Sequence, residues 1–411
     1  MFIYLYSFAY RCTLFLAKGI ALFSPRIKVF LEQRSQWKSS LKKVTPLSEE
    51  KKVFWFHTAS LGEFEQARPL IEKYRKHYPK AFIALTFFSA SGFTVQKDYT
   101  HADWVGYLPL DRKKDLNPFL KRLQPNALFL VKYEFWPQLI FSLKQKNIPI
   151  YSVSSIFRPE QLFFKPWHFG LRRIIKAIDH FYVQNKTSAA LLQSIGIEQV
   201  TLSGDTRFDR VLQISEQEID LPKINAFVKN QFCFVAGSSW PEDHEMILGP
   251  LQSEKIKIII APHKIDEETL GAIEKKLVLP YVRWSQFKET DSEKKVLIVD
   301  CIGLLTQIYA YADAAYVGGG LGHRGLHNTL EPAVFGIPII IGPHYKKFDE
   351  AIALTENKGT FSVHNSIEFE QTLKEIVRSK EQAKKIGQRN KAVVENRAGA
   401  VELIFSSLNQ K

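Results

Sequence analysis

The feature that most restricts the fold of this chain is the alternation of short apolar runs with longer amphipathic stretches. The amphipathic stretches favour helices, for example over 64–77, 112–122, 137–147 and 186–195. Strands that alternate with helices in this way are typical of a parallel sheet with crossover helices. In the first half of the chain the apolar runs predict strands at 53–57, 81–86, 127–131, 149–154, 180–183 and 199–203.

The same pattern weakens over the polar segment 209–230 and then begins again. The second set of predicted strands is 232–237, 256–261, 295–299, 313–317 and 337–341, followed by a helical tail over 367–408. We therefore predict an α/β chain with two Rossmann-like, doubly wound domains, 46–215 and 216–411, joined by a linker near 212–228. Ligands of such sheets bind at the carboxyl ends of the strands, which places the predicted site in a cleft between the domains.

The N-terminal segment, residues 1–24, is rich in aliphatic and aromatic residues but contains Arg11 and Lys18. A helix that crosses a bilayer needs about 20 apolar residues, and a central basic residue costs roughly 2.5–3.5 kcal/mol. We expect residues 1–45 to form a membrane anchor, either spanning or lying in the interface; the alternative is a helix packed on its own domain. The flank that follows is basic, with Arg26, Lys28, Arg34, Lys38, Lys42 and Lys43, and favours the cytoplasmic side.

The charge of the chain indicates anionic partners. Lys and Arg total 56 against 42 Asp and Glu, a formal net charge of +14, which attracts nucleic acid, anionic lipid or phosphorylated small molecules. The composition, 45% hydrophobic and 13% aromatic, excludes a disordered or collagenous chain. Three widely separated cysteines supply neither a disulfide framework nor a cysteine zinc site, so we expect a reducing compartment.

Two acidic residues follow predicted strands of the first domain. Glu63 comes after strand 53–57, where a carboxylate would face the ligand and act as a general base. Ser60 and Glu63 also fit a capping box, which would give both side chains a purely structural role. Glu134 follows strand 127–131 and precedes Pro137. There it needs a partner or a catalytic role, although an interaction with a helix N-terminus would also explain it.

Basic and glycine-rich segments supply candidate anion sites. Arg158 and Arg207 carry guanidinium groups that suit phosphates and carboxylates, although a single arginine is more often a solvated surface charge. The segment 316–332 (YVGGGLGHRGLHNTLEP) holds five glycines within eight residues, which allows close approach to a ligand. Asn328 is placed to cap the next helix, and Glu331 to bond ribose hydroxyls. Ser238 and Ser239 also lie where a strand meets a helix, which leaves amides for an anion.

The order and spacing of these blocks resemble those of the Kdo (3-deoxy-D-manno-octulosonic acid) transferases of lipid A biosynthesis. The resemblance spans nearly the whole chain, from the hydrophobic N-terminus onward. Its further blocks are 57–63 (HTASLGE) with 69–71 (PLI), 134–137 (EFWP), 204–209 (GDTRFD), 327–333 (HNTLEPA) and 342–344 (GPH).

The resemblance implies a GT-B glycosyltransferase that binds its acceptor in the first domain and its nucleotide sugar in the second. The implied donor is CMP-Kdo and the implied acceptor a tetraacyl lipid A precursor, at the cytoplasmic face of the inner membrane. Glu63 takes the place of the family's general base and Glu134 that of its second acid. Arg158 and Arg207 match positions that would neutralise donor or acceptor anions. We expect the donor site to include Ser238, Ser239, Gly319, Gly320, Gly322, Asn328, Glu331, Pro343 and His344.

No D-x-D motif stands in a suitable loop, so we expect neither a metal nor a cofactor, and CMP would leave against backbone amides and a helix N-terminus. The chain departs from the family at several donor-side positions: Lys132 stands where an acid is common, Gly320 where Ser is common, and Trp240 in a segment that often ends in His. Leu326 and Thr329 replace Gly and Pro. These departures affect the donor contacts more than the reaction class.

Three other functions compete with this interpretation. A different GT-B enzyme would use a UDP-sugar. An NAD-dependent oxidoreductase would use Gly320, Gly322 and Gly325, which fit G-x-G-x-x-G, but such a fingerprint belongs in the first βαβ unit, where none is seen. A nucleic-acid-binding protein would show arginine and lysine interleaved with aromatics or a known module, and the sequence has neither. We therefore expect no nucleic-acid partner.

Overall fold

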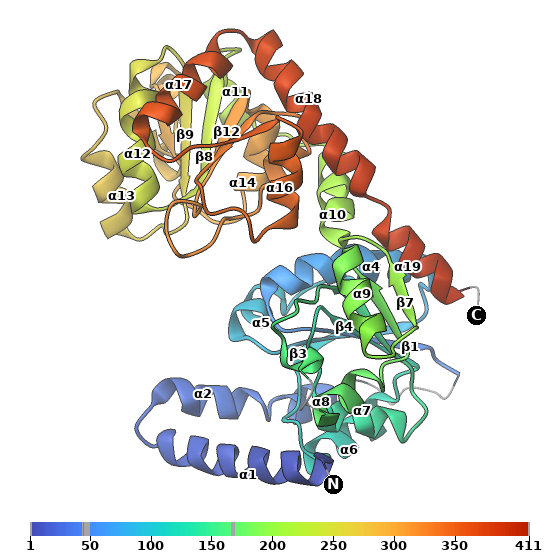
Figure 1. Cartoon of the computed structure of the whole chain (residues 1–411). Coiled ribbons are helices and arrows are strands. Elements are labelled where there is room, and N and C mark those ends of the chain that lie inside the picture. Colours follow the sequence, from blue (N-terminus) through green and yellow to red (C-terminus); the bar gives the residue numbers. More distant parts are fainter. Residues whose placement is uncertain (1, 43, 45–49, 166–168, 410–411) are drawn as a thin grey trace. The chain divides into compact units, whose positions relative to one another are not determined.

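The computed structural model describes residues 2–42, 44, 50–165 and 169–409 (Figure 1). These residues form two compact units, one made of 1–210 with 398–411 and the other of 211–397. Each unit is built on a parallel sheet, so the prediction of two Rossmann-like α/β domains is confirmed.

The first sheet has the strand order β3-β2-β1-β4-β5-β6-β7, and every described pairing in it is parallel. The strand order reverses between β1 and β4, which are neighbours, so their carboxyl ends flank the point where such sheets bind ligands. The strands are β1 (Val53–Thr58), β2 (Phe82–Phe87), β3 (Trp104–Tyr107), β4 (Ala127–Val131), β5 (Ile150–Ser155), β6 (His180–Val183) and β7 (Val200–Leu202).

Helices cover both faces of this sheet, which explains why its strands are apolar throughout rather than alternating. Trp55 of β1 lies in one core with Phe119, while Phe56 of the same strand lies in the other core with Phe64. The helices of this unit are α1 (Phe2–Ile20), α2 (Pro25–Gln33), α3 (Trp37–Lys42), α4 (Leu61–His77), α5 (Ala90–Gln96), α6 (Lys113–Leu123), α7 (Pro137–Lys144), α8 (Phe169–Ile175), α9 (Lys186–Ser194) and α19 (Ala400–Asn409), and α10 (Thr206–Ser215) runs from this unit into the second.

The second sheet has the order β10-β11-β9-β8-β12-β13-β14, again with parallel pairings, and reverses between β8 and β12. Its strands are β8 (Cys233–Ser239), β9 (Lys257–Pro262), β10 (Tyr281–Arg283), β11 (Val296–Ile298), β12 (Ala314–Val317), β13 (Ile339–Ile341) and β14 (Thr360–Ser362). Its helices are α11 (Pro222–Val228), α12 (Pro241–Ser253), α13 (Glu267–Glu274), α14 (Leu305–Ile308), α15 (Leu330–Ala333), α16 (Asp349–Glu356), α17 (Ser366–Val377) and α18 (Lys380–Arg397).

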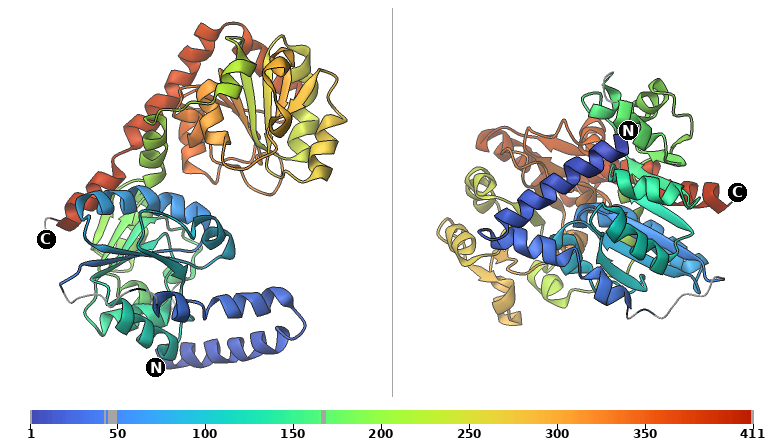
Figure 2. Two further views of the ribbon diagram at one scale, coloured as in Figure 1. Left: turned by 180° about the vertical axis from the view of Figure 1, so that it is seen from behind. Right: turned by 90° about the horizontal axis from the view of Figure 1, so that it is seen from below.

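The two units differ from the predicted domains at their edges. The C-terminal helix α19 belongs to the first unit and not to the second, because Ile404 and Phe405 pack beside Tyr74 of α4. Figure 2 shows this red C-terminal helix beside a blue helix of the same unit. The predicted linker 212–228 also contains helix α11, whose Ile224 and Phe227 are buried in the second unit's core.

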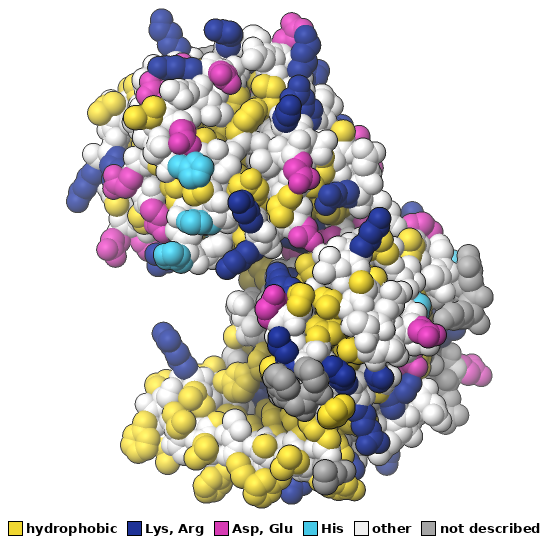
Figure 3. Space-filling view, in the orientation of Figure 1, with side chains coloured by type: hydrophobic (Ala, Val, Ile, Leu, Met, Phe, Trp, Pro, Cys, Tyr) yellow, Lys and Arg dark blue, Asp and Glu magenta, His cyan; other side chains and the backbone are white. Residues whose placement is uncertain are grey.

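The N-terminal helices α1 and α2 belong to the first unit. Tyr6 donates a hydrogen bond to the buried carboxylate of Asp111 (2.8 Å), and Ser7 donates to Gln138 on α7 (3.2 Å). The pair and the turn between its helices also carry exposed apolar side chains, including Phe15 of α1 and Phe23 of the turn, and Figure 3 shows hydrophobic atoms gathered over this part of the molecule. Among the described residues, no helix is both long and apolar enough to cross a bilayer. The spanning form of the predicted anchor is therefore not supported.

Candidate active site

Glu63 lies in the first turn of α4, directly after the carboxyl end of β1. The backbone amide of Ala59 donates to its Oε2 (2.5 Å), and its own amide donates to Ser60 Oγ (3.4 Å). The bond to Ser60 is the N-cap bond that the sequence allowed, whereas the other joins Glu63 to Ala59, one residue before the N-cap. The side chain is also buried, and this burial, with a smaller contribution from Glu134, raises the pKa of Glu63 to about 7. A carboxylate with such a pKa is poised to take a proton near neutral pH.

Glu134 follows β4, the neighbour of β1 in the sheet. The Trp136 indole Nε1 donates to its Oε2 (3.1 Å), and the buried His57 of β1 brings Nε2 to 3.9 Å from the same oxygen. Lys132, in the same loop, has a backbone φ of +58°, and its charge opposes the effect of Glu134 on the pKa of Glu63. The structure therefore brings the two predicted acidic residues close enough to interact electrostatically. The sequence analysis assigned no role to His57.

The two predicted arginines lie in different environments. Arg207 is held by the buried carboxylate of Asp205: its Nε lies 2.8 Å and its Nη2 2.6 Å from Asp205 Oδ2. Although burial by itself raises the pKa of Asp205, the Arg207 charge and the hydrogen bonds it receives hold that pKa below its ordinary value. Arg158 is exposed, on the loop after β5. The role predicted for these residues in binding anions stays a prediction.

The glycine-rich loop of the second unit follows β12 and crosses the loop after β13 at very close range. A Cβ on Gly320 would lie 2.9 Å from the backbone nitrogen of Gly342, and one on Gly342 would lie 2.3 Å from the Gly320 carbonyl carbon. The His344 amide donates to the Gly320 carbonyl (2.9 Å) and ties the two loops together. This packing leaves little room for a side chain at Gly320. It places Gly320 and the predicted 343–344 segment together.

A buried carboxylate that the sequence analysis missed holds this loop. Asp243 of α12 accepts hydrogen bonds from the amides of Trp240 (2.8 Å) and Gly319 (3.1 Å) and from the Tyr316 hydroxyl (2.6 Å). It thereby joins the loops after β8 and β12, which are adjacent strands. An acidic residue in the first turn of α12 was the available signal, because such residues cap helices.

The serines at the end of β8 are part of the same region. Ser238 has a backbone φ of +49°. The hydroxyl oxygen of the buried Ser239 lies 2.9 Å from Nε2 of His244. Burial lowers the pKa of His244 to about 4, so the imidazole is neutral at pH 7. The Ser239 hydroxyl is therefore occupied within the unit, while Ser238 lies at a bend where the strand meets α12.

Asn328 and Glu331 form a hydrogen-bonded pair at the start of α15. The Asn328 amide donates to Glu331 Oε1 (3.0 Å), its oxygen accepts from the Leu330 amide (3.2 Å), and Thr306 donates to Glu331 Oε2 (2.8 Å). The N-cap of α15 is Thr329 and not Asn328 as predicted, although Asn328, one residue earlier, accepts from the first residue of the helix. The Glu331 carboxylate is oriented by side chains from two loops.

An aromatic stack that the sequence analysis did not predict lies beside the glycine-rich loop. The rings of Trp240 and His263 are 4.3 Å apart and those of His263 and His327 are 4.5 Å apart, while the Trp240 indole donates to His327 Nε2 (2.9 Å). Arg324 lies over the Trp240 ring (4.1 Å). A hollow of about 230 Å³ next to it is lined by Trp240, Arg324 and Lys264 together with acidic residues of α13. Stacked rings with a guanidinium over them form a flat surface that suits a planar heterocycle such as a nucleotide base.

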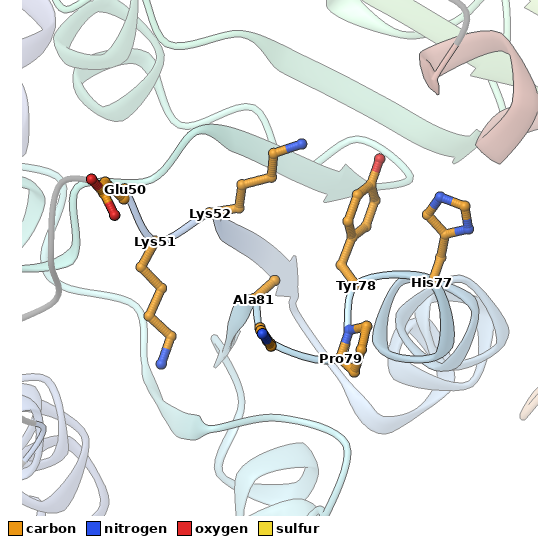
Figure 4. Close-up of a pocket in the computed structure, with 8 residues that line it drawn as sticks. Glu50, Lys51, Lys52, His77, Tyr78, Pro79 and Ala81 are labelled. Carbon is orange, nitrogen blue, oxygen red and sulfur yellow. The ribbon is translucent and has the colours of Figure 1, made fainter.

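Among the described residues, no group of three or more His, Cys, Asp or Glu side chains is arranged to hold a metal ion. A larger hollow of about 490 Å³ lies at the opposite edge of the first sheet, before β1 and after α4. Figure 4 shows Lys52, Tyr78 and His77 of its lining pointing to one side and Lys51 to the other. Because it adjoins the amino ends of the strands, it is separate from Glu63 and Glu134.

Comparison with known proteins finds a family model and several curated relatives that are similar to this chain. Residues 32–210 match the family model described as 3-deoxy-D-manno-octulosonic-acid transferase (kdotransferase). The 3-deoxy-D-manno-octulosonic acid transferase of Aquifex aeolicus is 28% identical, over 81% of this chain and 88% of that protein. A bifunctional glycosyltransferase/methyltransferase of Fusobacterium nucleatum is also 28% identical over 92% of this chain, but the match spans only 60% of that longer protein.

Solved structures share the fold at low identity. UDP-GlcNAc 2-epimerase from Neisseria meningitidis, bound to UDP-GlcNAc, superposes with a TM-score of 0.63 at 14% identity, over 88% of this chain and all of that one. This likeness shows the two-sheet architecture alone. The family model over residues 32–210 and the aligned relatives show that the chain is similar to the Kdo transferases.

Proposed function

We propose that this protein is an inverting, metal-independent glycosyltransferase that moves Kdo from CMP-Kdo to a tetraacyl lipid A precursor in lipopolysaccharide biosynthesis. The single observation that carries the proposal is Glu63, a buried carboxylate with a pKa of about 7 at the carboxyl end of β1. Its position coincides with the general base that the resemblance implies. The names of the aligned relatives support the transfer of this sugar acid.

In the proposed reaction, Glu63 removes the proton of the acceptor hydroxyl as that oxygen bonds to the anomeric carbon of Kdo. The bond from this carbon to the phosphate oxygen breaks on the opposite side, and CMP leaves with the electron pair. The loops after β12 and β13 would meet the phosphate with backbone amides, and Glu331 would bond the ribose hydroxyls. Burial would keep Glu63 basic, and Glu134 would be the second acidic group beside it.

We further propose that the enzyme is attached to the cytoplasmic face of the inner membrane through α1 and α2, lying in the interface. Exposed apolar side chains on this pair, such as Phe15 (78% exposed) and Phe23 (88% exposed), would enter the boundary between headgroups and acyl chains. Arg11, Lys18 and Arg26 are exposed on the same helices and would attract anionic lipid.

The transfer assay combines CMP-Kdo generated in situ with the lipid A precursor in detergent, and resolves products by mass. We expect a product that is heavier by one or more Kdo units from the wild-type chain, and none when either substrate is left out. Failure of a folded chain to form it would refute the assignment of donor and acceptor. The mass also counts the sugars added.

Membrane attachment is tested separately by sedimentation with vesicles of neutral and anionic phospholipid. We expect Phe15→Ser with Phe23→Ser to abolish sedimentation. The matched control is Val278→Ser with Ile302→Ser, which removes two equally exposed apolar side chains from the second unit and should sediment as the wild type does. Equal binding by both variants would refute the interfacial anchor.

A GT-B enzyme that uses a UDP-sugar is the second candidate, because the solved structure with a similar fold is described as bound to UDP-GlcNAc. Titration calorimetry with CMP and UDP separates the two. Tighter binding of UDP than of CMP would favour the second candidate. The oxidoreductase alternative gains no support, since its glycines follow β12 and lie outside the first βαβ unit of that sheet.

A further inference from the structure

His57 is a histidine in an unusual place, because β1 is otherwise a buried apolar strand. Its side chain is fully buried, and its backbone pairs with Thr86 of β2 and Leu130 of β4. Neither pairing partner is ionisable. A buried imidazole in the middle of a sheet needs a hydrogen-bond partner for each ring nitrogen, since unpaired polar groups are costly there.

The surroundings of Nδ1 determine which nitrogen carries a proton. Nδ1 lies 3.1 Å from the Thr86 carbonyl oxygen, which accepts hydrogen bonds and cannot donate one. The Thr86 hydroxyl, 2.9 Å away, receives the Trp55 indole N–H and has the Phe56 carbonyl within reach for its own hydrogen. Both neighbours of Nδ1 are therefore acceptors. Nδ1 carries a hydrogen in every protonation state of the ring.

The other ring nitrogen, Nε2, makes no hydrogen bond among the described residues and faces a carboxylate. Among the described residues Nε2 is buried without a hydrogen-bond partner, and Glu134 Oε2 lies 3.9 Å away. In a neutral ring whose Nδ1 is protonated, the Nε2 lone pair would point toward a carboxylate. A proton on Nε2 replaces this repulsion with an ion pair. Of the two groups, imidazole has the higher ordinary proton affinity.

We propose that His57 is a positioning residue that remains an imidazolium, holding Glu134 as its counter-ion and thereby setting the charge beside Glu63. The other charged groups around the pair are Glu63 from α4 and Lys132 from the loop after β4. With the proton on His57, the His57–Glu134 pair is neutral as a unit, so Glu63 ionises more readily than beside an isolated carboxylate. The pair's proton stays in place while Glu63 takes the proton of the acceptor. The role at Glu63 depends on the proposed function, whereas the proton on His57 does not.

The protonation state is tested by ¹⁵N NMR on the full chain labelled at histidine, with the His57 signals assigned by their loss in His57→Gln. At pH 7.5 we expect both ring nitrogens of His57 to show the shifts of imidazolium. In Glu134→Gln, the signals should change to those of a neutral ring protonated at Nδ1. A neutral His57 in the wild-type chain at this pH would overturn the proposal, whether or not any transfer activity is found.

The effect on Glu63 is tested by the pH profile of kcat/KM for transfer. In His57→Gln we expect the acid limb of the profile to move up by about one pH unit. At pH values below the limb kcat/KM should then fall about tenfold, whereas at high pH it should change little. The control is His180→Gln, which changes a histidine of β6 in the same sheet and should leave the profile in place. An unmoved limb in His57→Gln would refute the role at Glu63. If His57→Gln fails to fold, the ¹⁵N comparison with Glu134→Gln still decides the protonation state.

Discussion

Replacing Glu63 by glutamine should make the protein inactive and, at alkaline pH, more stable. Burial raises the pKa of this carboxyl from 4.5 to about 7, so the folded state binds the proton more tightly than the unfolded state does. The contribution of Glu63 to stability is therefore most favourable below pH 4.5, and it is lost as the pH rises through 7. The difference amounts to about 3 kcal/mol above pH 7, as an upper bound.

Glutamine keeps an oxygen to accept from the Ala59 amide, so Glu63→Gln preserves one cap bond while removing the charge. At pH 8.5 we expect its Tm to exceed that of the wild type by several degrees, since about 1 kcal/mol shifts the Tm of a domain of this size by about 2–4 °C. At pH 4.5 the gain should vanish. Transfer should fall by about 10²–10⁴-fold, the usual contribution of a general base.

Calorimetry at the two pH values, run beside the transfer assay, tests both effects. The control is Glu72→Gln on the same helix, whose carboxylate pairs with Arg68 at 2.9 Å; it should not gain stability with pH and should stay active. The wild-type kcat/KM should itself fall about tenfold per pH unit below pH 7. A Glu63→Gln chain that remains active and loses stability at pH 8.5 would reduce Glu63 to a helix cap.

Three predictions concern the second unit and the role of metals. Gly342→Ala should raise the KM for the donor at least about tenfold and destabilise this unit by about 1–3 kcal/mol, because its Cβ would overlap the Gly320 backbone; unchanged kinetics and Tm would contradict the close packing. Asp243→Asn should cost about 2–4 kcal/mol of unfolding free energy in a urea titration, since buried donors lose their acceptor; a loss below about 0.5 kcal/mol would contradict this role. Transfer should persist in EDTA, and an activity that needs an added divalent cation would refute metal independence.

Much of the fold could be predicted because buried parallel strands leave a strong local signal. The eleven apolar runs that predicted strands all lie at observed strands, including 53–57 at β1 and 337–341 at β13. The missed strands β3, β10 and β14 are three or four residues long and lie at or near sheet edges. A strand such as β10, whose Tyr281 is exposed, lacks the continuous apolar run that identifies central strands.

The return of α19 to the first unit could not be predicted from local pattern. Its amphipathic sequence indicates a helix with an apolar face, but the residues of that face do not determine which of the two units it packs against. The partners Tyr74 and Phe129 of its buried residues lie more than 250 residues earlier in the chain. Glu63 and Glu134 could be predicted as a site because each directly follows a strand, and strand order then made them neighbours. Asp243 holds the equivalent position after β8, but it was overlooked because the motifs singled out in that region were its serines.

The number of hydrogen bonds that a buried carboxylate receives distinguishes a carboxylate that holds the fold from one that is free to react. Asp243 accepts from three donors, and Asp111 likewise accepts from the Tyr6 hydroxyl and the amides of Gln138 and Leu139. With both oxygens engaged, each of these two groups has little capacity left for a substrate proton.

Glu63 is also buried, yet within the described residues it accepts only from the Ala59 amide, through Oε2. Its second oxygen keeps its lone pairs, while burial supplies the basicity. Sequence position could not make this distinction, because Glu63 and Asp243 are both the third residue of a helix that follows the first strand of a sheet. The difference arises from donors on distant segments, Tyr316 and Gly319, which reach Asp243 and have no counterpart at Glu63 among those residues. This is the physical reason to place the reactive base in the first unit.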